Sequence, residues 1–167
     1  AVVRGIAAYN VADKPRSFFD KLNSWAQGEG QPGLGYILLS DGEAKGPIGK
    51  FLSKEAIDII KNKANAKEGD AIFFICNKVK EAENFAGKSR MKIAEDMDII
   101  EKNVFKFCWT VDFPMYELDE NTNSIVFSHN PFSMPQGGME ALENKDPLDI
   151  LAWQYDIICN GIELSSG

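Results

Sequence analysis

The chain has 167 residues and a formal net charge of −7, with 44% hydrophobic and 26% charged residues. This composition is typical of a globular protein. No apolar run approaches the ~20 residues of a membrane-spanning helix, and no basic segment leads into an apolar core and a cleavage site, so we expect neither a membrane span nor a secretory signal.

Three cysteines, Cys76, Cys108 and Cys159, are odd in number and far apart in the sequence. This spacing fits neither a disulfide framework nor a zinc site. Together with the missing signal features, it predicts a cytoplasmic protein.

The two parts of the chain differ in charge. Residues 1–100 carry 15 Lys+Arg against 14 Asp+Glu, whereas residues 101–167 carry 3 against 11. Binding of nucleic-acid phosphates needs a cationic surface, so the second part is not expected to bind them by itself.

The first hundred residues predict an α+β module with three strands and three amphipathic helices. Pro15 suits a first helical turn, and Ser53 suits an N-cap, each ahead of apolar residues at steps of three and four. The predicted strands are 2–8, 34–39 and 71–76, and the predicted helices begin after Pro15 and span 54–64 and 79–94.

The predicted helix 79–94 carries basic residues on its outer surface. Two interpretations are open, a solvated face or a weak contact with an RNA backbone. The residues concerned are Lys78, Lys80, Lys88, Arg90 and Lys92.

Apolar side chains alternate from Phe105 to Phe113, which predicts a strand that Pro114 stops. After turn-forming residues at 119–123, a return strand is expected at 124–128, so the two strands would form a hairpin. Further on we expect a helix at 139–144, a helical turn at Asp146 and Pro147, and a strand at 153–159. Asn160 and Gly161 predict a bend or bulge before a last strand at 162–165.

His129 is the only histidine and lies between a strand end and two prolines. A lone histidine in such a loop is more often structural than functional. Asp112 and Ser128 are available for a Ser/His/Asp triad, but no Gly-x-Ser-x-Gly elbow accompanies them, and a metal site needs more ligands.

Asp156 and Glu163 are seven residues apart, which in one unbroken strand would place them on opposite faces. A bulge at Asn160 and Gly161 would bring them onto one face. Two carboxylates on one face suit magnesium, which takes one or two carboxylates plus phosphate oxygens. The alternative is two unrelated surface carboxylates.

Several motifs resemble, in order and spacing, the second half of the catalytic domain of bacterial-type aspartyl-tRNA synthetases of class II. They are Trp-Thr-Val-Asp-Phe-Pro-Met-Tyr from residue 109, Ser-His-Asn-Pro-Phe-Ser-Met-Pro from residue 128, and Tyr-Asp-Ile-Ile-Cys-Asn-Gly-Ile-Glu-Leu from residue 155. Upstream, the segments at 32–37, 46–52 and 69–74 resemble the GAD insertion domain of that family. The resemblance covers nearly the whole chain.

The resemblance implies a site and partners. The position of His129 matches a contact to the substrate aspartate, Glu163 matches a ligand of ATP and magnesium, and Asp156 matches its acidic partner. Many family members have a second histidine where this chain has Asn130. The implied cofactors are ATP and Mg²⁺, and the implied partners are aspartate, tRNA-Asp, tRNA-Asn as a further option, and a second subunit in a homodimer.

The expected domains are a GAD-like module at 1–104, of mixed or antiparallel sheet with helices, and an incomplete piece of the antiparallel catalytic sheet at 105–167. The ends suggest an excised piece. The resemblance places two functional arginines outside it, so the chain alone is expected to hold no complete catalytic set and to be inactive.

Two other functions stay open. GAD-like domains also resemble an insert in tRNA-dependent amidotransferases, which would make the chain a non-enzymatic tRNA-binding or scaffolding module. Segment 106–164 discriminates between these two, because the amidotransferase context does not supply it. A small hydrolase using His129 is the third interpretation.

Overall fold

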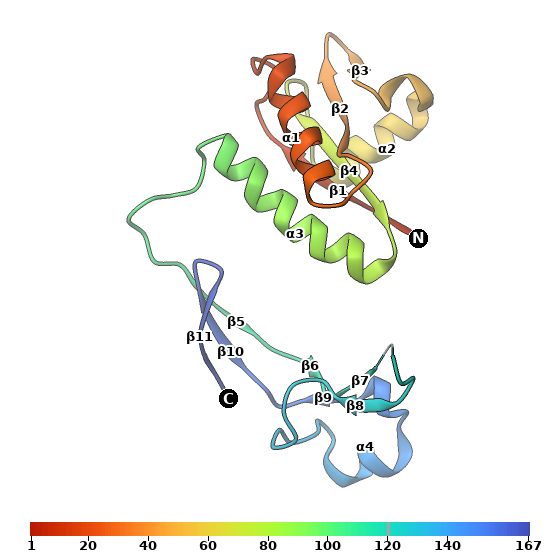
Figure 1. Ribbon diagram of the computed structural model, residues 1–167, viewed down its shortest axis with the longest axis vertical. Helices are drawn as coiled ribbons and strands as arrows, with labels where there is room; N and C mark the ends of the chain where they lie inside the picture. The colour runs from red at the N-terminus through yellow and green to blue at the C-terminus, as the bar shows by residue number, and fades with distance from the viewer. Residues whose placement is uncertain (120) are drawn as a thin grey trace. The chain divides into compact units, whose positions relative to one another are not determined.

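The computed structural model describes residues 1–119 and 121–167 (Figure 1). It divides into two compact units, the first unit Ala1–Ile100 and the second unit Glu101–Gly167. Part of the turn predicted at 119–123 falls on Glu120, which lies outside the described residues. Among the described residues, no helix combines the length and apolar character that a membrane crossing requires.

The first unit is a four-stranded antiparallel sheet with strand order β1-β4-β2-β3 and three α-helices. The predicted helices and strands are all present, and the short strand β3 was not predicted. In chain order the elements are β1 (Val2–Ala8), α1 (Arg16–Gly28), β2 (Gly35–Ser40), β3 (Glu43–Lys45), a 3-10 turn (Gly49–Phe51), α2 (Lys54–Ala64), β4 (Ala71–Asn77) and α3 (Val79–Asp96).

Helices cover both faces of this sheet. Neighbouring residues of the central strand β4 point to opposite faces, as the two-residue period of a strand requires. Phe73 belongs to a core cluster with α1 and α3, whereas Ile72 belongs to one packed against α2. Both residues are at most 1% exposed, so the first unit has a closed core on each side of its sheet.

The helix α2 begins where the sequence predicts. Ser53 has extended backbone angles, and its hydroxyl oxygen accepts a hydrogen bond from the amide of Ala56 at 3.2 Å. This bond satisfies one of the amide groups that the first turn leaves without a partner. Lys54 is therefore the first helical residue.

The second unit consists of short antiparallel strands in three small sheets. Their orders are β11-β10-β5, β6-β9 and β7-β8. In chain order the elements are β5 (Phe107–Thr110), β6 (Phe113–Pro114), β7 (Tyr116–Leu118), β8 (Ile125–Phe127), α4 (Gly138–Asn144), a 3-10 turn (Pro147–Asp149), β9 (Leu151–Ala152), β10 (Asp156–Cys159) and β11 (Ile162–Ser166). The α+β fold class is confirmed, and every pairing between named strands of the described residues is antiparallel.

The hairpin predicted between segments 105–113 and 124–128 is wrong. Asp112 has a φ of 59°, which breaks the first segment into β5 and β6. β5 pairs with β10 and β6 with β9, while β8 pairs with β7. The predicted strand 153–159 is also shorter, because β10 begins at Asp156.

The second unit buries few large side chains. Its described core cluster contains Met115, Ile150 and Ala152, with Tyr116 packed against it. The alternating aromatic side chains of β5 are exposed instead, Phe107 at 61% and Trp109 at 64%. The alternation therefore predicted strand structure at β5, but it predicted neither the break at Asp112 nor the exposure of the apolar face.

Candidate functional site

The strands β10 and β11 form a tight hairpin closed by Asn160 and Gly161. The two residues have φ angles of 51° and 82°, and Cys159 pairs with Ile162 across them. Two successive residues with positive φ are the mark of a type I′ turn. Of the bend or bulge predicted at this position, the bulge is wrong, because the chain reverses here in a turn.

An irregularity does occur further along the hairpin. Ile158 pairs with Glu163, whereas Ile157 pairs with Ser165, so Leu164 is an extra residue in β11. One extra residue on one strand is the arrangement of a β-bulge.

This register places Asp156 and Glu163 on the same face of the sheet. Residues opposite each other in an antiparallel pair share a face, and alternate residues of one strand do as well. Asp156 and Ile158 alternate along β10, and Glu163 lies opposite Ile158. The two residues thus share one face through a hairpin turn and a bulge at Leu164.

The two carboxylates differ in their surroundings. Asp156 is 8% exposed, and its Oδ1 accepts a hydrogen bond of 2.7 Å from the hydroxyl of Ser166, its partner across the strands. Glu163 is exposed to solvent. Asp156 is held in place while Glu163 is free to reach a ligand.

This donor set fits magnesium bound together with a phosphate. Among the described residues, no three His, Cys, Asp or Glu side chains form a group that could hold a metal ion alone. Magnesium needs only one or two carboxylates when phosphate oxygens and water complete its octahedron. Glu163, with Asp156 behind it, offers such a pair.

His129 follows β8 and lies against β6. The centroid of its ring is 4.6 Å from that of Phe113, with the ring planes at 83°. This edge-to-face contact orients the imidazole ring against Phe113. His129 is nevertheless exposed to solvent.

Asn130 organises the loop that carries His129. Its Oδ1 accepts hydrogen bonds from the amides of Phe132 at 3.1 Å and Ser133 at 3.0 Å. The Ser133 hydroxyl lies 3.1 Å from the same oxygen and 3.2 Å from Oε1 of Gln154, which is 2% exposed. Asn130 therefore has a structural task that an imidazole would not reproduce. The sequence signal for it is the Asn-Pro pair, which favours a side-chain-bonded turn.

The chain path connects the histidine with the carboxylates. Thr110 is the partner of Asp156 in the β5–β10 pair, and Phe113 follows Thr110 by three residues. Three residues span at most about 11 Å. His129 therefore packs on Phe113, whose backbone lies within about 11 Å of Thr110, the strand partner of Asp156.

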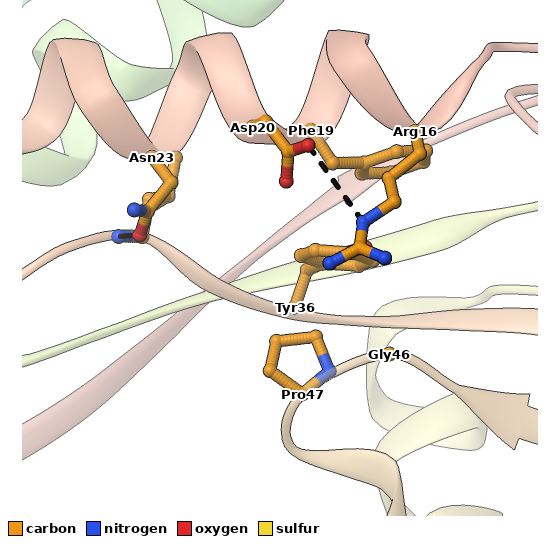
Figure 2. A pocket seen from close by; sticks show the side chains of 8 residues that line it. Arg16, Phe19, Asp20, Asn23, Tyr36, Gly46 and Pro47 are labelled. Carbon is orange, nitrogen blue, oxygen red and sulfur yellow. Dashed lines mark hydrogen bonds and ion pairs between the residues drawn. The ribbon is translucent and has the colours of Figure 1, made fainter.

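A separate pocket in the first unit was not predicted from the sequence. It has a volume of about 510 Å³ and lies between α1, β2 and the Gly46–Pro47 loop (Figure 2). Arg16 and Asp20 form an ion pair of 3.7 Å at its rim, and Tyr36 stacks on Phe19 at 4.3 Å.

Glycine at position 46 keeps the loop close to the pocket wall. Gly46 has a φ of 104°, and a Cβ there would approach the Tyr36 ring to 2.9 Å. Burial raises the pKa of the Tyr36 hydroxyl, and the Asp20 carboxylate raises it further.

The family model of the GAD domain matches residues 1–86. The chain belongs to the GAD domain family. The match covers β1 to β4 and the first part of α3, so this GAD domain contains the pocket around Tyr36 and lacks His129, Asp156 and Glu163.

Curated relatives match the GAD domain together with the second unit. The chain is 60% identical over 167 residues to an aspartate–tRNA(Asp/Asn) ligase of Paramagnetospirillum magneticum, covering 100% of this chain and 19% of the relative. It is 56% identical over 165 residues to the ligase of that name from Gluconobacter oxydans, covering 99% of this chain and 28% of the relative. A Rickettsia bellii ligase of the same name is 56% identical over 172 residues, covering 100% and 29%. The chain thus spans less than a third of the length of these relatives, and the resemblance to aspartyl-tRNA synthetases is confirmed.

Proposed function

We propose that this chain is part of an aspartate–tRNA ligase that activates aspartate with ATP and transfers it to tRNA. The observation that carries the proposal is identity of 56% or more to ligases over 99% or more of the chain. This identity extends beyond the GAD domain into the second unit, which favours a ligase over an isolated tRNA-binding module. In the proposed organisation, residues 1–104 are the insertion module and residues 105–167 belong to the catalytic domain.

Glu163 is the proposed ligand of magnesium and ATP. It is exposed, shares a face with Asp156, and lies on a two-stranded hairpin that fixes its backbone. Asp156 is the proposed acidic partner, held by the hydroxyl of Ser166. Magnesium-bound ATP would supply the reactive α-phosphate with part of its negative charge neutralised. The carboxylates would position that group, and positioning is a large part of catalysis in reactions of this kind.

His129 is the proposed contact to the substrate aspartate. An imidazole can donate a hydrogen bond to a carboxylate, or carry a positive charge opposite it. The contact with Phe113 orients the ring, and the bonds made by Asn130 shape the loop behind it. In the proposed reaction, a carboxylate oxygen of aspartate bonds to the α-phosphorus and pyrophosphate leaves. A ribose hydroxyl of tRNA then attacks the aspartyl carbonyl, and AMP leaves.

The remaining parts of the proposal concern partners and location. The RNA partner is tRNA-Asp, with tRNA-Asn as a second substrate in keeping with the relatives' printed names. The ligase is proposed to act as a cytoplasmic homodimer. Activity is expected of the longer protein and not of these 167 residues alone.

The test is aspartate-dependent exchange of pyrophosphate into ATP, measured on the full-length ligase that contains this chain. Glu163→Gln should lower the rate constant by roughly 10²-fold, with a smaller effect on aspartate binding, because the lost charge faces magnesium and phosphate. Glu117→Gln, on the exposed strand β7 of another sheet, is the matched control and should exchange normally.

His129→Ala should act mainly on the aspartate requirement. Loss of a hydrogen bond to a charged group costs about 1.5–3 kcal/mol, which corresponds to a rise of about tenfold or more in the aspartate KM. Unchanged exchange kinetics in both the His129 and the Glu163 variants would show that the assigned site is wrong.

A further inference from the structure

A groove between α1 and α3 of the first unit concentrates positive charge. It has a volume of about 460 Å³, and its lining includes three lysines and two aromatic side chains. Residues 14, 18, 21 and 25 follow one another at steps of four, three and four, so they form one stripe along α1 and the turn before it. Lys92 and Asp96, four residues apart on α3, form the facing side.

The charges of the groove do not cancel. Its lining contains the ammonium groups of Lys14, Lys21 and Lys92 against one carboxylate, that of Asp96. Lys92 Nζ lies 2.7 Å from that carboxylate, while Lys14 Nζ lies 5.9 Å from the centroid of the Phe18 ring. The groove thus presents two ammonium groups in excess.

The rest of α3 is different. From residue 79 to residue 96 the helix carries four Lys and Arg and four Asp and Glu, and Lys88 is paired with Glu29 at 2.8 Å. The basic outer surface predicted for this helix is therefore balanced by acidic residues. The positive excess lies where α3 faces α1.

The walls of the groove are rigid. Trp25 stacks on Phe85 with ring centroids 5.3 Å apart, and Phe18 meets Phe19 edge to face at 5.2 Å. Both Phe19 and Phe85 belong to the buried core. The side walls of the groove are therefore anchored in the core, and the three lysines line it beside them.

We propose that this groove binds the phosphate backbone of an RNA strand. Lys21 lies on α1 and Lys14 on the turn before it, so both ammonium groups line the same groove and are available to phosphates of one strand. Lysine supplies the point charges that phosphates need, and the excess is local. The choice of RNA rests on the proposed function. The groove belongs to the first unit, whereas His129, Asp156 and Glu163 belong to the second unit.

The experiment uses the isotope-labelled 167-residue chain and a short RNA hairpin of arbitrary sequence, followed by amide NMR shifts. We expect the largest shifts at residues 14–25 and 88–96. Two phosphate contacts, one for each ammonium group in excess, give a slope of about −1.4 to −1.8 in a plot of log affinity against log salt concentration. At 0.1 M salt the screening length is about 10 Å, so the groove lysines dominate over distant acidic residues.

Removal of Lys14, Lys21 and Lys92 together, each as Lys→Ala, should move this slope close to zero and abolish the localised shifts. The matched control removes the exposed Lys50, Lys54 and Lys63, the same charge change elsewhere on the first unit, and should keep the slope. Lys→Arg at the three groove positions should restore binding.

Three outcomes would overturn the proposal. One is an unchanged slope in the groove variant, and another is an equal loss in the control variant. The third is groove-dependent binding to vesicles of phosphatidylcholine and phosphatidylserine that exceeds binding to RNA. Pyrophosphate exchange requires aspartate and ATP but no RNA, so failure of the groove and failure of the proposed function give separate results.

Discussion

The hydroxyl of Ser166 donates a hydrogen bond of 2.7 Å to Oδ1 of Asp156, directly across the β10–β11 pair. Asp156 is 8% exposed and has little access to water as a replacement partner. A buried carboxylate that loses its donor bears a desolvation penalty of about 1–3 kcal/mol. The position of the Asp156 carboxylate therefore depends on Ser166, which no motif in the sequence singles out.

Ser166→Ala should weaken this hairpin by about 1–2 kcal/mol. We expect hydrogen exchange at the β10 amides to accelerate by roughly tenfold, since 1.4 kcal/mol corresponds to a factor of ten. Ser165→Ala is the matched control, because Ser165 pairs with Ile157 on the other face of the sheet. Equal acceleration in the two variants would show that the Ser166 hydroxyl has no special role.

Asn160 should contribute more to stability than a turn residue with positive φ alone would. Its Nδ2 donates to the carbonyl of Val104 at 2.8 Å, and its Oδ1 accepts from the amide of Lys106 at 2.9 Å. Asn160→Gly keeps a residue that tolerates a φ of 51° but removes both bonds, which should cost roughly 1–3 kcal/mol.

The readout for Asn160→Gly is hydrogen exchange at Lys106 and along β5 and β10. Asn123→Gly provides the control, since Asn123 has a similar φ of 54° without a hydrogen bond from its side chain among those of the described residues. If exchange at Lys106 stayed as slow as in the unmodified chain, the side-chain bonds of Asn160 would not be holding segment 104–106.

Elements that are determined by local sequence were predicted, whereas elements that are determined by pairing with distant segments were not. The three helices of the first unit were predicted because their periodicity and the Ser53 cap are local features. The strands of the second unit are short, and pairing sets their limits. β6 is only Phe113–Pro114 and exists through its partner Leu151–Ala152. A turn at Asp112 with positive φ cannot be recognised from the alternation of the aromatic residues around it.

The candidate site shows the same division. The sequence predicts a shared face for Asp156 and Glu163 through a bulge at Asn160, whereas the structure produces it through a turn there and a bulge at Leu164. An Asn-Gly pair between two apolar runs is a strong hairpin signal, and the hypothesis of one continued strand overlooked it. The roles of Asn130 and Ser166 depend on partners that only the folded register reveals.

Tyr36 should titrate above an ordinary tyrosine. Burial raises its pKa most, Asp20 raises it further, and Arg16 lowers it. Because the folded-state pKa is raised, the associated stability is fully present below the unfolded value of about 10 and is lost as the pH rises through the folded pKa.

Ring-proton NMR of Tyr36 between about pH 8 and 12 checks this. Asp20→Asn should lower the Tyr36 midpoint, while Arg16→Gln should raise it, so the two rim residues in Figure 2 give opposite signs. Asp13→Asn, which changes the same charge elsewhere, should leave the midpoint in place. A Tyr36 midpoint at or below that of an unfolded chain would refute the assignment of burial as the main cause.

A piece ending at residue 104 should fold alone, and a piece ending at residue 86 should not. The helix α3 runs from Val79 to Asp96, so a cut at 86, where the family match ends, removes half of it. Ile93 is 3% exposed in the core shared with α1. Truncating one such side chain to alanine costs about 2–5 kcal/mol, against total stabilities of about 5–15 kcal/mol.

Hydrogen exchange at the amides of Phe73 and Phe74 distinguishes the two pieces. Both residues lie in β4, which pairs with β1 on one side and β2 on the other. Opening of these amides requires global unfolding, so the 1–104 piece should protect them as the whole chain does, and the 1–86 piece should lose most of this protection. A 1–100 piece serves as the control, because it retains all of α3. An unfolded 1–104 piece would refute the two-module division, and full protection in 1–86 would show that the second half of α3 adds little to the core.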